Sequence, residues 1–202
     1  SLIRQYYKPM KRYVDYLASQ DSCYILRMGL GDWYDYGPWR AGFARNTPMP
    51  LVSTAHYYWW NHLMGEARAD SIREAFNREF YNPQTHRYAS GSQCAQAIAL
   101  CMNLVPDGDR QAVLDQLVAD IHQHGDRLTT GDIGNRYLFK ALIDGGQREL
   151  LYRMLNHDEV PGYGYQIKQG MTTLTEQWNP KHGASMNQIG RASCRERVCH
   201  RV

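Results

Sequence analysis

The chain of 202 residues lacks the features that mark several large classes of protein. It has no run of about 18 apolar residues, which excludes a transmembrane helix. The HExxH spacing, the GxGxxG loop and the GxSxG elbow are all missing, so neither a zinc peptidase, a dinucleotide fold nor a serine hydrolase is indicated. We therefore expect no metal ion and no cofactor.

Cysteine is scarce and unpaired. Of the five cysteines, two lie in the last 14 residues, and the other three are Cys23, Cys94 and Cys101. An odd number without short paired spacings fits neither a disulfide framework nor a zinc site. Cys94 and Cys101 lie in an apolar run with helical spacing, so we expect them to be small core residues.

Excess charge of one sign is also missing from most of the chain. The formal net charge is +3, but residues 189–202 hold four arginines and one glutamate, and the other 188 residues carry 19 basic and 19 acidic side chains. Nucleic-acid binding needs clustered Lys and Arg, so we expect no nucleic-acid partner. The 15 tyrosines and 5 tryptophans instead suit a neutral polar ligand such as a sugar.

The last 14 residues differ in kind from the rest. The segment 189–202 has no helical period, and its IGRASCRERVC is identified as the translation of a common sequencing adapter. We expect it to be a non-native tail, the alternative being a genuine basic arm. The domain is then residues 1–188.

What the sequence has is helical periodicity. We predict about seven helices, over residues 3–19, 50–65, 67–80, 92–104, 109–123, 135–144 and 147–156. The first should present one wide apolar face, formed by Ile3, Tyr6, Tyr7, Met10, Tyr13, Val14 and Leu17. Short turns alternate with long loops at 20–47, 81–92, 124–134 and 157–187, and no useful β-alternation occurs. The fold class is all-α, as stacked antiparallel hairpins in an α/α toroid or as a bundle.

Three of the long loops could carry chemistry. GLGDWYDYGPW (29–39) combines Asp32 and Asp35 with aromatic rings, as a sugar site requires, but a core-plugging Trp33 with two capping aspartates is equally open. PGYGYQIKQGMTTLTEQWN (161–179) holds one carboxylate, Glu176, two residues before Trp178; it could be a base or a solvated loop residue. LTTGDIGNRY (128–137) could be functional or a helix cap.

The order of these motifs resembles a known family. GLGDWYDYGP, NTP with STAHYYWW, AFNREFYNPQTHRYASGSQCAQAIAL, LTTGDIGNRY and PGYGYQIKQGMTTLTEQWN with SMN occur in the order seen in bacterial α-L-rhamnosidases of glycoside hydrolase family 78. The resemblance covers residues 1–188. It implies an (α/α)6 six-hairpin toroid that hydrolyses terminal α-L-rhamnose with inversion at the anomeric carbon.

The resemblance also implies roles for particular residues. Glu176, in TTLTEQW, matches the general base that activates the hydrolytic water, and Trp33 matches an aromatic residue that faces the sugar. The substrate-binding residues it implies are Asp32, Trp33, Asp35, Tyr165, Trp178 and Asn187. The family's Ser-x-Asn-His reads Ser-Met-Asn-Gln here, with Gln188 in place of histidine next to the suspected tail.

One expected part of the mechanism has no counterpart in the sequence. The family's general acid lies in an acidic, Arg-containing motif N-terminal to the matched region, and the chain opens at Ser1 within a predicted helix. We therefore expect the chain to be the C-terminal part of the barrel, a partial toroid that lacks the first hairpins. Such a part should be inactive alone. We expect its partner to be a rhamnose-containing glycoside and expect no membrane association. The sequence is compatible with the cytoplasm, the periplasm and secretion.

Two alternatives remain at this point. The first is another six-hairpin carbohydrate hydrolase of the trehalase or glucoamylase type, which shares the toroid but not the TTLTEQW context. The second is a non-catalytic helical scaffold, in which Glu176 and the aromatic residues would not converge.

Overall fold

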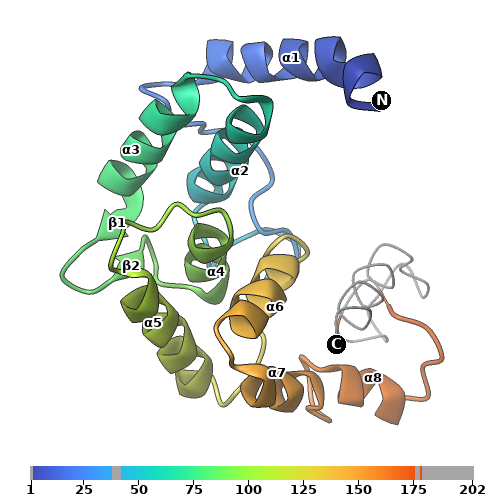
Figure 1. The fold of residues 1–202 in the computed structure, drawn as a ribbon. Coiled ribbons are helices and arrows are strands. Elements are labelled where there is room, and N and C mark those ends of the chain that lie inside the picture. Colours follow the sequence, from blue (N-terminus) through green and yellow to red (C-terminus); the bar gives the residue numbers. More distant parts are fainter. Residues whose placement is uncertain (1, 38–41, 176–177, 179–202) are drawn as a thin grey trace.

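The computed structural model describes residues 2–37, 42–175 and 178, and it is built from helical hairpins (Figure 1). In this part of the chain the helices are α1 (Leu2–Gln20), α2 (Met49–Met64), α3 (Arg68–Phe80), α4 (Gln93–Cys101), α5 (Arg110–Gln123), α6 (Gly134–Asp144), α7 (Arg148–Leu155) and α8 (Tyr163–Lys168). Two short strands, β1 (Tyr81–Asn82) and β2 (Arg87–Tyr88), form an antiparallel hairpin. The prediction of an all-α fold is confirmed, with boundaries within three residues for the seven predicted helices.

The helices form two layers along an arc. The inner helices α2, α4 and α6 contact one another in sequence order, and α3, α5 and α7 pack on their outer side (Figure 1). In α4 the eight residues from Gln93 to Leu100 are all buried, because helices surround it. In α5 burial follows a single stripe of four apolar residues, Val113, Leu114, Leu117 and Ile121. This alternation of inner and outer helices is the stacking that the sequence predicted.

The first helix forms as predicted, but most of its apolar face is exposed. Of the residues of the predicted apolar face from Tyr6 onward, Val14 and Leu17 are buried, whereas Tyr6, Tyr7, Met10 and Tyr13 are 44–49% exposed. The helical period is present as expected. Among the described helices, α1 makes its main contact with α2. One neighbour covers one narrow stripe, so the rest of the face stays open to solvent.

Two short elements were missed by the sequence analysis. The loop 81–92 contains the β1–β2 hairpin, in which Tyr81 pairs with Tyr88, and the predicted loop 157–187 contains α8. Gly162 and Gly164, at the start of α8, lower the helix propensity of this segment. Helix α8 nevertheless forms next to α7, where the Tyr165 amide donates to the carbonyl of His157 over 2.8 Å.

The connections between consecutive helices differ in length. Short turns of a few residues join α2 to α3 and α6 to α7, whereas the longest segments lead from α1 to α2, from α3 to α4 and from α5 to α6. The αL glycine Gly65 ends α2, which is the usual way to stop a helix abruptly. The α1–α2 and α5–α6 connections are hydrogen-bonded to each other, and the candidate site lies there. None of the helices in the described residues is long and apolar enough to cross a membrane.

Candidate functional site

The loop between α1 and α2 is hydrogen-bonded directly to the loop between α5 and α6. The Tyr36 amide donates to the Thr129 carbonyl (3.0 Å), and the Asp132 amide donates to the Trp33 carbonyl (2.7 Å). The approach is so close that a Cβ on Gly131 would lie 2.1 Å from the Trp33 carbonyl oxygen. Two of the three loops predicted to carry chemistry therefore form one unit, across about 100 residues of sequence.

Asp32 lies inside this unit and faces the protein. Its two carboxylate oxygens accept the backbone N–H groups of Gly131 (2.8 Å) and Gly134 (2.6 Å), and the residue has no exposed surface. Burial raises the pKa of Asp32 to about 6, and the two N–H donors oppose that rise. Gly134 is the first residue of α6, so Asp32 caps this helix from a distant loop. Of the two roles considered for Asp32, these contacts support the capping role and leave no oxygen directed at solvent.

Asp35 occupies a similar position on the other side of the loop. One of its oxygens accepts the amides of Arg45 (2.6 Å) and Asn46 (2.5 Å), and the side chain is buried. The amide group of Asn46 in turn donates to the carbonyls of Tyr36 (2.9 Å) and Thr129 (2.8 Å). Asp35 and Asn46 thus brace the loop against its neighbour. A direct substrate contact, the role the resemblance implies for Asp32 and Asp35, stays a prediction that these contacts do not support.

Trp33 lies at the surface of the unit among other aromatic rings. It is half-buried, and its ring meets the rings of Tyr34 and Phe43 edge-on, with centroids 5.8 and 5.5 Å away. Phe43 is 67% exposed. Aromatic faces of this kind pack against the C–H groups of a sugar ring. Trp33 is therefore partly exposed, in contrast with the two buried aspartates.

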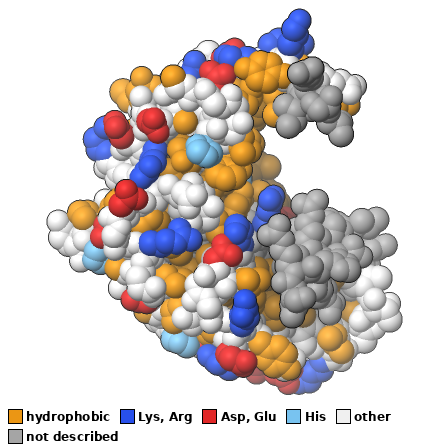
Figure 2. All heavy atoms as spheres, in the orientation of Figure 1, with side chains coloured by type: hydrophobic (Ala, Val, Ile, Leu, Met, Phe, Trp, Pro, Cys, Tyr) orange, Lys and Arg blue, Asp and Glu red, His pale blue; other side chains and the backbone are white. Residues whose placement is uncertain are grey.

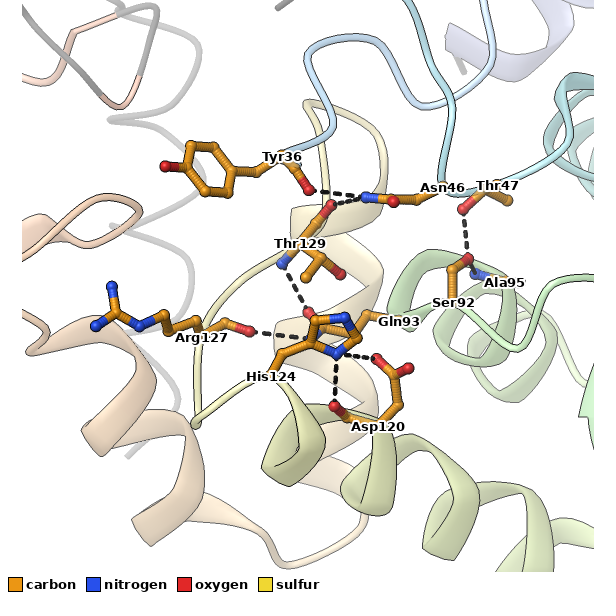
Figure 3. Close-up of polar contacts among 10 residues, drawn as sticks. All are labelled: Tyr36, Asn46, Thr47, Ser92, Gln93, Ala95, Asp120, His124, Arg127 and Thr129. Atoms are coloured by element: carbon orange, nitrogen blue, oxygen red, sulfur yellow. Dashed lines mark hydrogen bonds and ion pairs between the residues drawn. The ribbon is translucent and has the colours of Figure 1, made fainter. Parts of the chain in front are cut away.

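A buried amide on α4 fixes the position of the second loop (Figure 3). Gln93 donates through Nε2 to the Arg127 carbonyl (3.0 Å) and accepts the Thr129 amide at Oε1 (3.0 Å). The neighbouring Ser92 caps α4, with its Oγ accepting the Ala95 amide and lying 2.6 Å from the Thr47 hydroxyl. Two polar side chains of α4 thus tie the inner helix to both loops.

The Tyr36 and Arg127 side chains extend toward the same side of this network (Figure 3). Burial raises the pKa of the Tyr36 hydroxyl, and both Arg127 and Tyr165 lie near enough to act on it electrostatically. The Arg127 guanidinium also pairs with Glu159 and donates to the Val160 carbonyl (3.1 Å). Arg127 therefore joins the first two loops to the third, which contains Tyr165.

The third loop is anchored on both sides of the predicted base. Thr175 is buried and accepts a hydrogen bond from Nε2 of Gln166 (2.8 Å), and Trp178 is buried with its ring 5.0 Å from that of Tyr163. Gln166 and Tyr163 belong to α8. Glu176 itself and Asn187 lie outside the described residues, as does the segment 189–202. Tyr165 lies near enough to Tyr36 of the first loop to act on it electrostatically, and Trp178 packs on Tyr163 of the same short helix as Tyr165.

The sequence analysis missed Asn46, Gln93 and Arg127. Gln93 and Gln96 carried a usable signal, because two amides in the apolar run QCAQAIALC must bond to something if they are buried. His56, by contrast, is a half-buried histidine of α2 that bonds within the protein. Its Nδ1 lies 2.8 Å from the Val52 carbonyl and its Nε2 lies 3.0 Å from the Tyr137 hydroxyl.

Charged side chains of both signs lie on the face of the molecule in Figure 2. Acidic and basic side chains are interspersed on the face shown in Figure 2, with no extended patch of one sign among the described residues. No group of three or more His, Cys, Asp or Glu residues within 2–37, 42–175 and 178 could hold a metal ion. The described part of the site offers aromatic faces and neutral polar groups.

A family comparison decides the class of this domain. The profile described as the bacterial alpha-L-rhamnosidase 6 hairpin glycosidase domain matches residues 1–194. The chain belongs to this family. The prediction from the order of the loop motifs is thereby confirmed, and the alternative of a trehalase- or glucoamylase-type six-hairpin domain is set aside.

Individual relatives of this rhamnosidase-family domain agree. An alpha-L-rhamnosidase of Streptomyces avermitilis is 30% identical over 164 residues, which cover 75% of the chain and 15% of that protein. An alpha-L-rhamnosidase of Formosa agariphila is 24% identical over 88% of the chain and 21% of its own length. The chain thus spans about a fifth or less of the length of these relatives.

Solved structures confirm the six-hairpin fold. The structure of the Streptomyces avermitilis alpha-L-rhamnosidase complexed with L-rhamnose superimposes with a TM-score of 0.79 at 27% identity, over 91% of this chain and 19% of that one. The alpha-L-rhamnosidase from Dictyoglumus thermophilum gives 0.78 at 30% identity, over 91% and 23%. That of Aspergillus terreus, at 21% identity, gives 0.83 over 95% and 25%, a likeness of fold. The arc of hairpins in Figure 1 is therefore part of a six-hairpin toroid.

Proposed function

We propose that the protein containing this domain hydrolyses terminal α-L-rhamnose from rhamnosides, with inversion at the anomeric carbon. The observation that carries the proposal is the joining of the three motif-bearing loops. Trp33 is partly exposed on the first loop, Arg127 links the second to the third, and the residues flanking position 176 are anchored to α8. The Streptomyces avermitilis relative was crystallised with L-rhamnose, and we extend that ligand to this domain.

In this proposal Glu176 is the general base. It takes a proton from a water molecule on the face of the sugar opposite the leaving oxygen, and the oxygen of that water forms the new bond to the anomeric carbon as the glycosidic bond breaks. The leaving oxygen takes a proton from a second carboxyl group, which an inverting mechanism requires roughly 6.5–9.5 Å from the base. The resemblance assigns that acid to a motif preceding the region matched here.

The other residues act by positioning and packing. Trp33 packs against the ring of the sugar, with Tyr165 and Trp178 as further walls and Asn187 as a polar contact. Asp32 and Asp35 contribute through the loop rather than by touching substrate, since their oxygens accept backbone amides. The ligand is a neutral rhamnose unit of a glycoside, in keeping with the mixed charges on the face in Figure 2.

The test is Glu176→Gln in the full-length protein. Glutamine keeps the shape and removes the base, so kcat on an aryl α-L-rhamnoside should fall by about 10²–10⁴ while KM changes little. The exposed Glu149→Gln on α7 is the matched control and should keep normal kcat. Proton NMR of the first product should show the β-anomer, as inversion requires. A Glu176→Gln enzyme with near-normal kcat, or an α-anomer as first product, would contradict the mechanism.

A further inference from the structure

In the first loop, which carries Trp33 (the Trp33 loop), residues 32–36 are held by hydrogen bonds of the backbone. The Asp35 amide donates to the Asp32 carbonyl (3.1 Å), which closes a tight turn, and the Tyr34 amide donates to the Gly42 carbonyl (3.2 Å). Tyr34 has a left-handed φ of 60°, which is uncommon for an aromatic residue and persists where the surrounding contacts enforce it. The loop therefore presents its side chains from a fixed backbone.

Tyr36 is the last residue of this segment, and both of its backbone groups are bonded. Its amide donates to the Thr129 carbonyl (3.0 Å), and its carbonyl accepts Nδ2 of Asn46 (2.9 Å). The side chain is half-buried and packs against the hydrophobic core. A tyrosine that is fixed in this way holds its hydroxyl in one position, which recognition of a single ligand group requires.

Groups from the other two loops lie near the Tyr36 hydroxyl. The Tyr36 side chain extends toward the same side of the network as that of Arg127 (Figure 3), and both Arg127 and Tyr165 act on the hydroxyl electrostatically. In the part of the chain that the structure describes, Tyr36 makes its hydrogen bonds through its backbone alone. The hydroxyl can therefore serve a ligand, because a phenol both donates and accepts.

The charge near this hydroxyl suits a neutral group. Burial raises the pKa of Tyr36, so its hydroxyl stays protonated at neutral pH. The Arg127 guanidinium is paired with Glu159 and donates to the Val160 carbonyl (3.1 Å), so its charge is compensated within the protein. A hydroxyl group of the substrate matches these surroundings better than an anionic group does.

We propose that Tyr36 is a specificity-determining residue of the sugar site, whose hydroxyl bonds to one ring hydroxyl of the terminal rhamnose unit. The inference rests on the proposed function, in which Trp33, three residues earlier on the same loop, packs against the sugar ring. One loop then provides both contacts that a sugar needs, an aromatic face for its C–H groups and a polar tip for a hydroxyl. Tyr36 takes no part in the proton transfer at Glu176.

The test is a thermodynamic cycle in the full-length protein between Tyr36→Phe and the hydroxyls of the substrate. The substrates are an aryl α-L-rhamnoside and its three monodeoxy analogues, which lack the hydroxyl at C2, C3 or C4. Tyr36→Phe should lower kcat/KM about three- to tenfold on the parent and on two analogues, and leave it unchanged on the analogue without the contacted hydroxyl. The intrinsic effect of each deletion on bond cleavage is the same for both enzymes, so it cancels in the cycle.

Two controls separate recognition from folding. Tyr152→Phe removes a hydroxyl from a tyrosine that is 66% exposed on α7, and it should leave kcat/KM unchanged on all four substrates. Tyr36→Phe should keep the wild-type midpoint of urea denaturation, because the ring still packs against the core.

Two results would overturn the role of Tyr36. They are no loss of kcat/KM on any substrate, and equal losses on all four, which would identify Tyr36 as a support of the loop. If wild type cleaves the parent rhamnoside and Glu176→Gln does not, the proposed function stands in either case. If wild type does not cleave the parent, the proposed function is wrong, and the role of Tyr36 in recognising rhamnose is wrong with it.

Discussion

Asp32 and Gly134 are 102 residues apart in sequence, yet the Asp32 carboxylate accepts the Gly134 backbone amide over 2.6 Å. The second oxygen accepts the Gly131 amide, so one side chain satisfies an unpaired donor of α6 and an amide of the loop before it. The thiol of Cys94 on α4 also lies against this carboxylate. Three segments that approach the site from different hairpins therefore meet at Asp32.

The pH dependence of stability should reveal this buried carboxyl. Burial raises the pKa of Asp32 to about 6 from 3.8, so the folded state binds this proton more tightly than the unfolded state does. The stabilisation from this group is complete below about pH 4 and is lost as the pH rises through 6. Asparagine at this position cannot titrate. In urea denaturation of wild type and Asp32→Asn, the stability advantage of wild type should shrink by about 2–3 kcal/mol between pH 4 and 7.5. An advantage that is constant or grows with pH would contradict this assignment.

Gly131 should be intolerant of any side chain. A Cβ there would lie 2.1 Å from the Trp33 carbonyl oxygen and 2.6 Å from backbone atoms of both Asp32 and Asp35. Since backbone cannot rotate away as a side chain can, Gly131→Ala should push the two loops apart and cost about 2–4 kcal/mol in urea denaturation.

The control for this substitution is Gly145→Ala. At that position the nearest atoms are methyl groups of Leu114, which can change rotamer. A loss of about 1 kcal/mol or less is expected there. Equal losses for the two substitutions would show that the close approach of the loops is not what constrains Gly131.

The sequence predicted the hairpins well because their signal is local. In α5 and α7, apolar residues at three- and four-residue spacing mark the buried stripe, and both helices form where that spacing occurs. The same spacing in α1 was misleading. The period shows that Tyr6 and Tyr13 share a helix face, but it cannot show whether any neighbour covers that face, and in the described structure they are exposed.

The site was less predictable because its contacts are long-range. Nothing local to Asp32 distinguishes a sugar ligand from a helix cap, since its partners lie about 100 residues away. Gln93 and Arg127 were missed for the same reason, as their roles depend on which loop carbonyls and amides come within reach. The family resemblance pointed to loops of which two are hydrogen-bonded to each other in the structure. The contacts of each side chain within those loops depend on the tertiary structure.

Trp33 and Phe43 should contact different parts of a bound glycoside, the sugar and the aryl group respectively. The half-buried Trp33 should pack the sugar, so Trp33→Ala should reduce affinity for any α-L-rhamnoside about tenfold or more. Phe43 lies further out, 67% exposed, with its ring 5.5 Å from that of Trp33. Phe43→Ala should therefore weaken an aryl rhamnoside several-fold and methyl rhamnoside little, as measured by ligand-observed NMR. The exposed Leu63→Ala on α2 is the control and should change neither. Equal effects of Phe43→Ala on the two ligands would show that Phe43 supports Trp33 rather than extending the platform.

The two buried glutamines of α4 allow stability to be separated from binding. Gln93 bonds to the backbone of Arg127 and Thr129 in the candidate site, whereas Gln96 accepts the Tyr88 amide (2.7 Å) and donates to the His86 carbonyl (3.0 Å) in the β1–β2 hairpin. Gln93→Ala and Gln96→Ala each leave buried loop backbone without partners, so each should lower the free energy of unfolding by about 1–3 kcal/mol.

Only Gln93→Ala should also weaken rhamnoside binding at the Trp33 loop, because it releases Arg127 and Thr129 and, through Thr129, Tyr36. In the full-length enzyme the same variant should raise KM more than it lowers kcat, since it disturbs binding rather than the base. If Gln96→Ala impairs binding as much as Gln93→Ala does, the effect is general loosening of α4, and Gln93 has no specific part in positioning the loop.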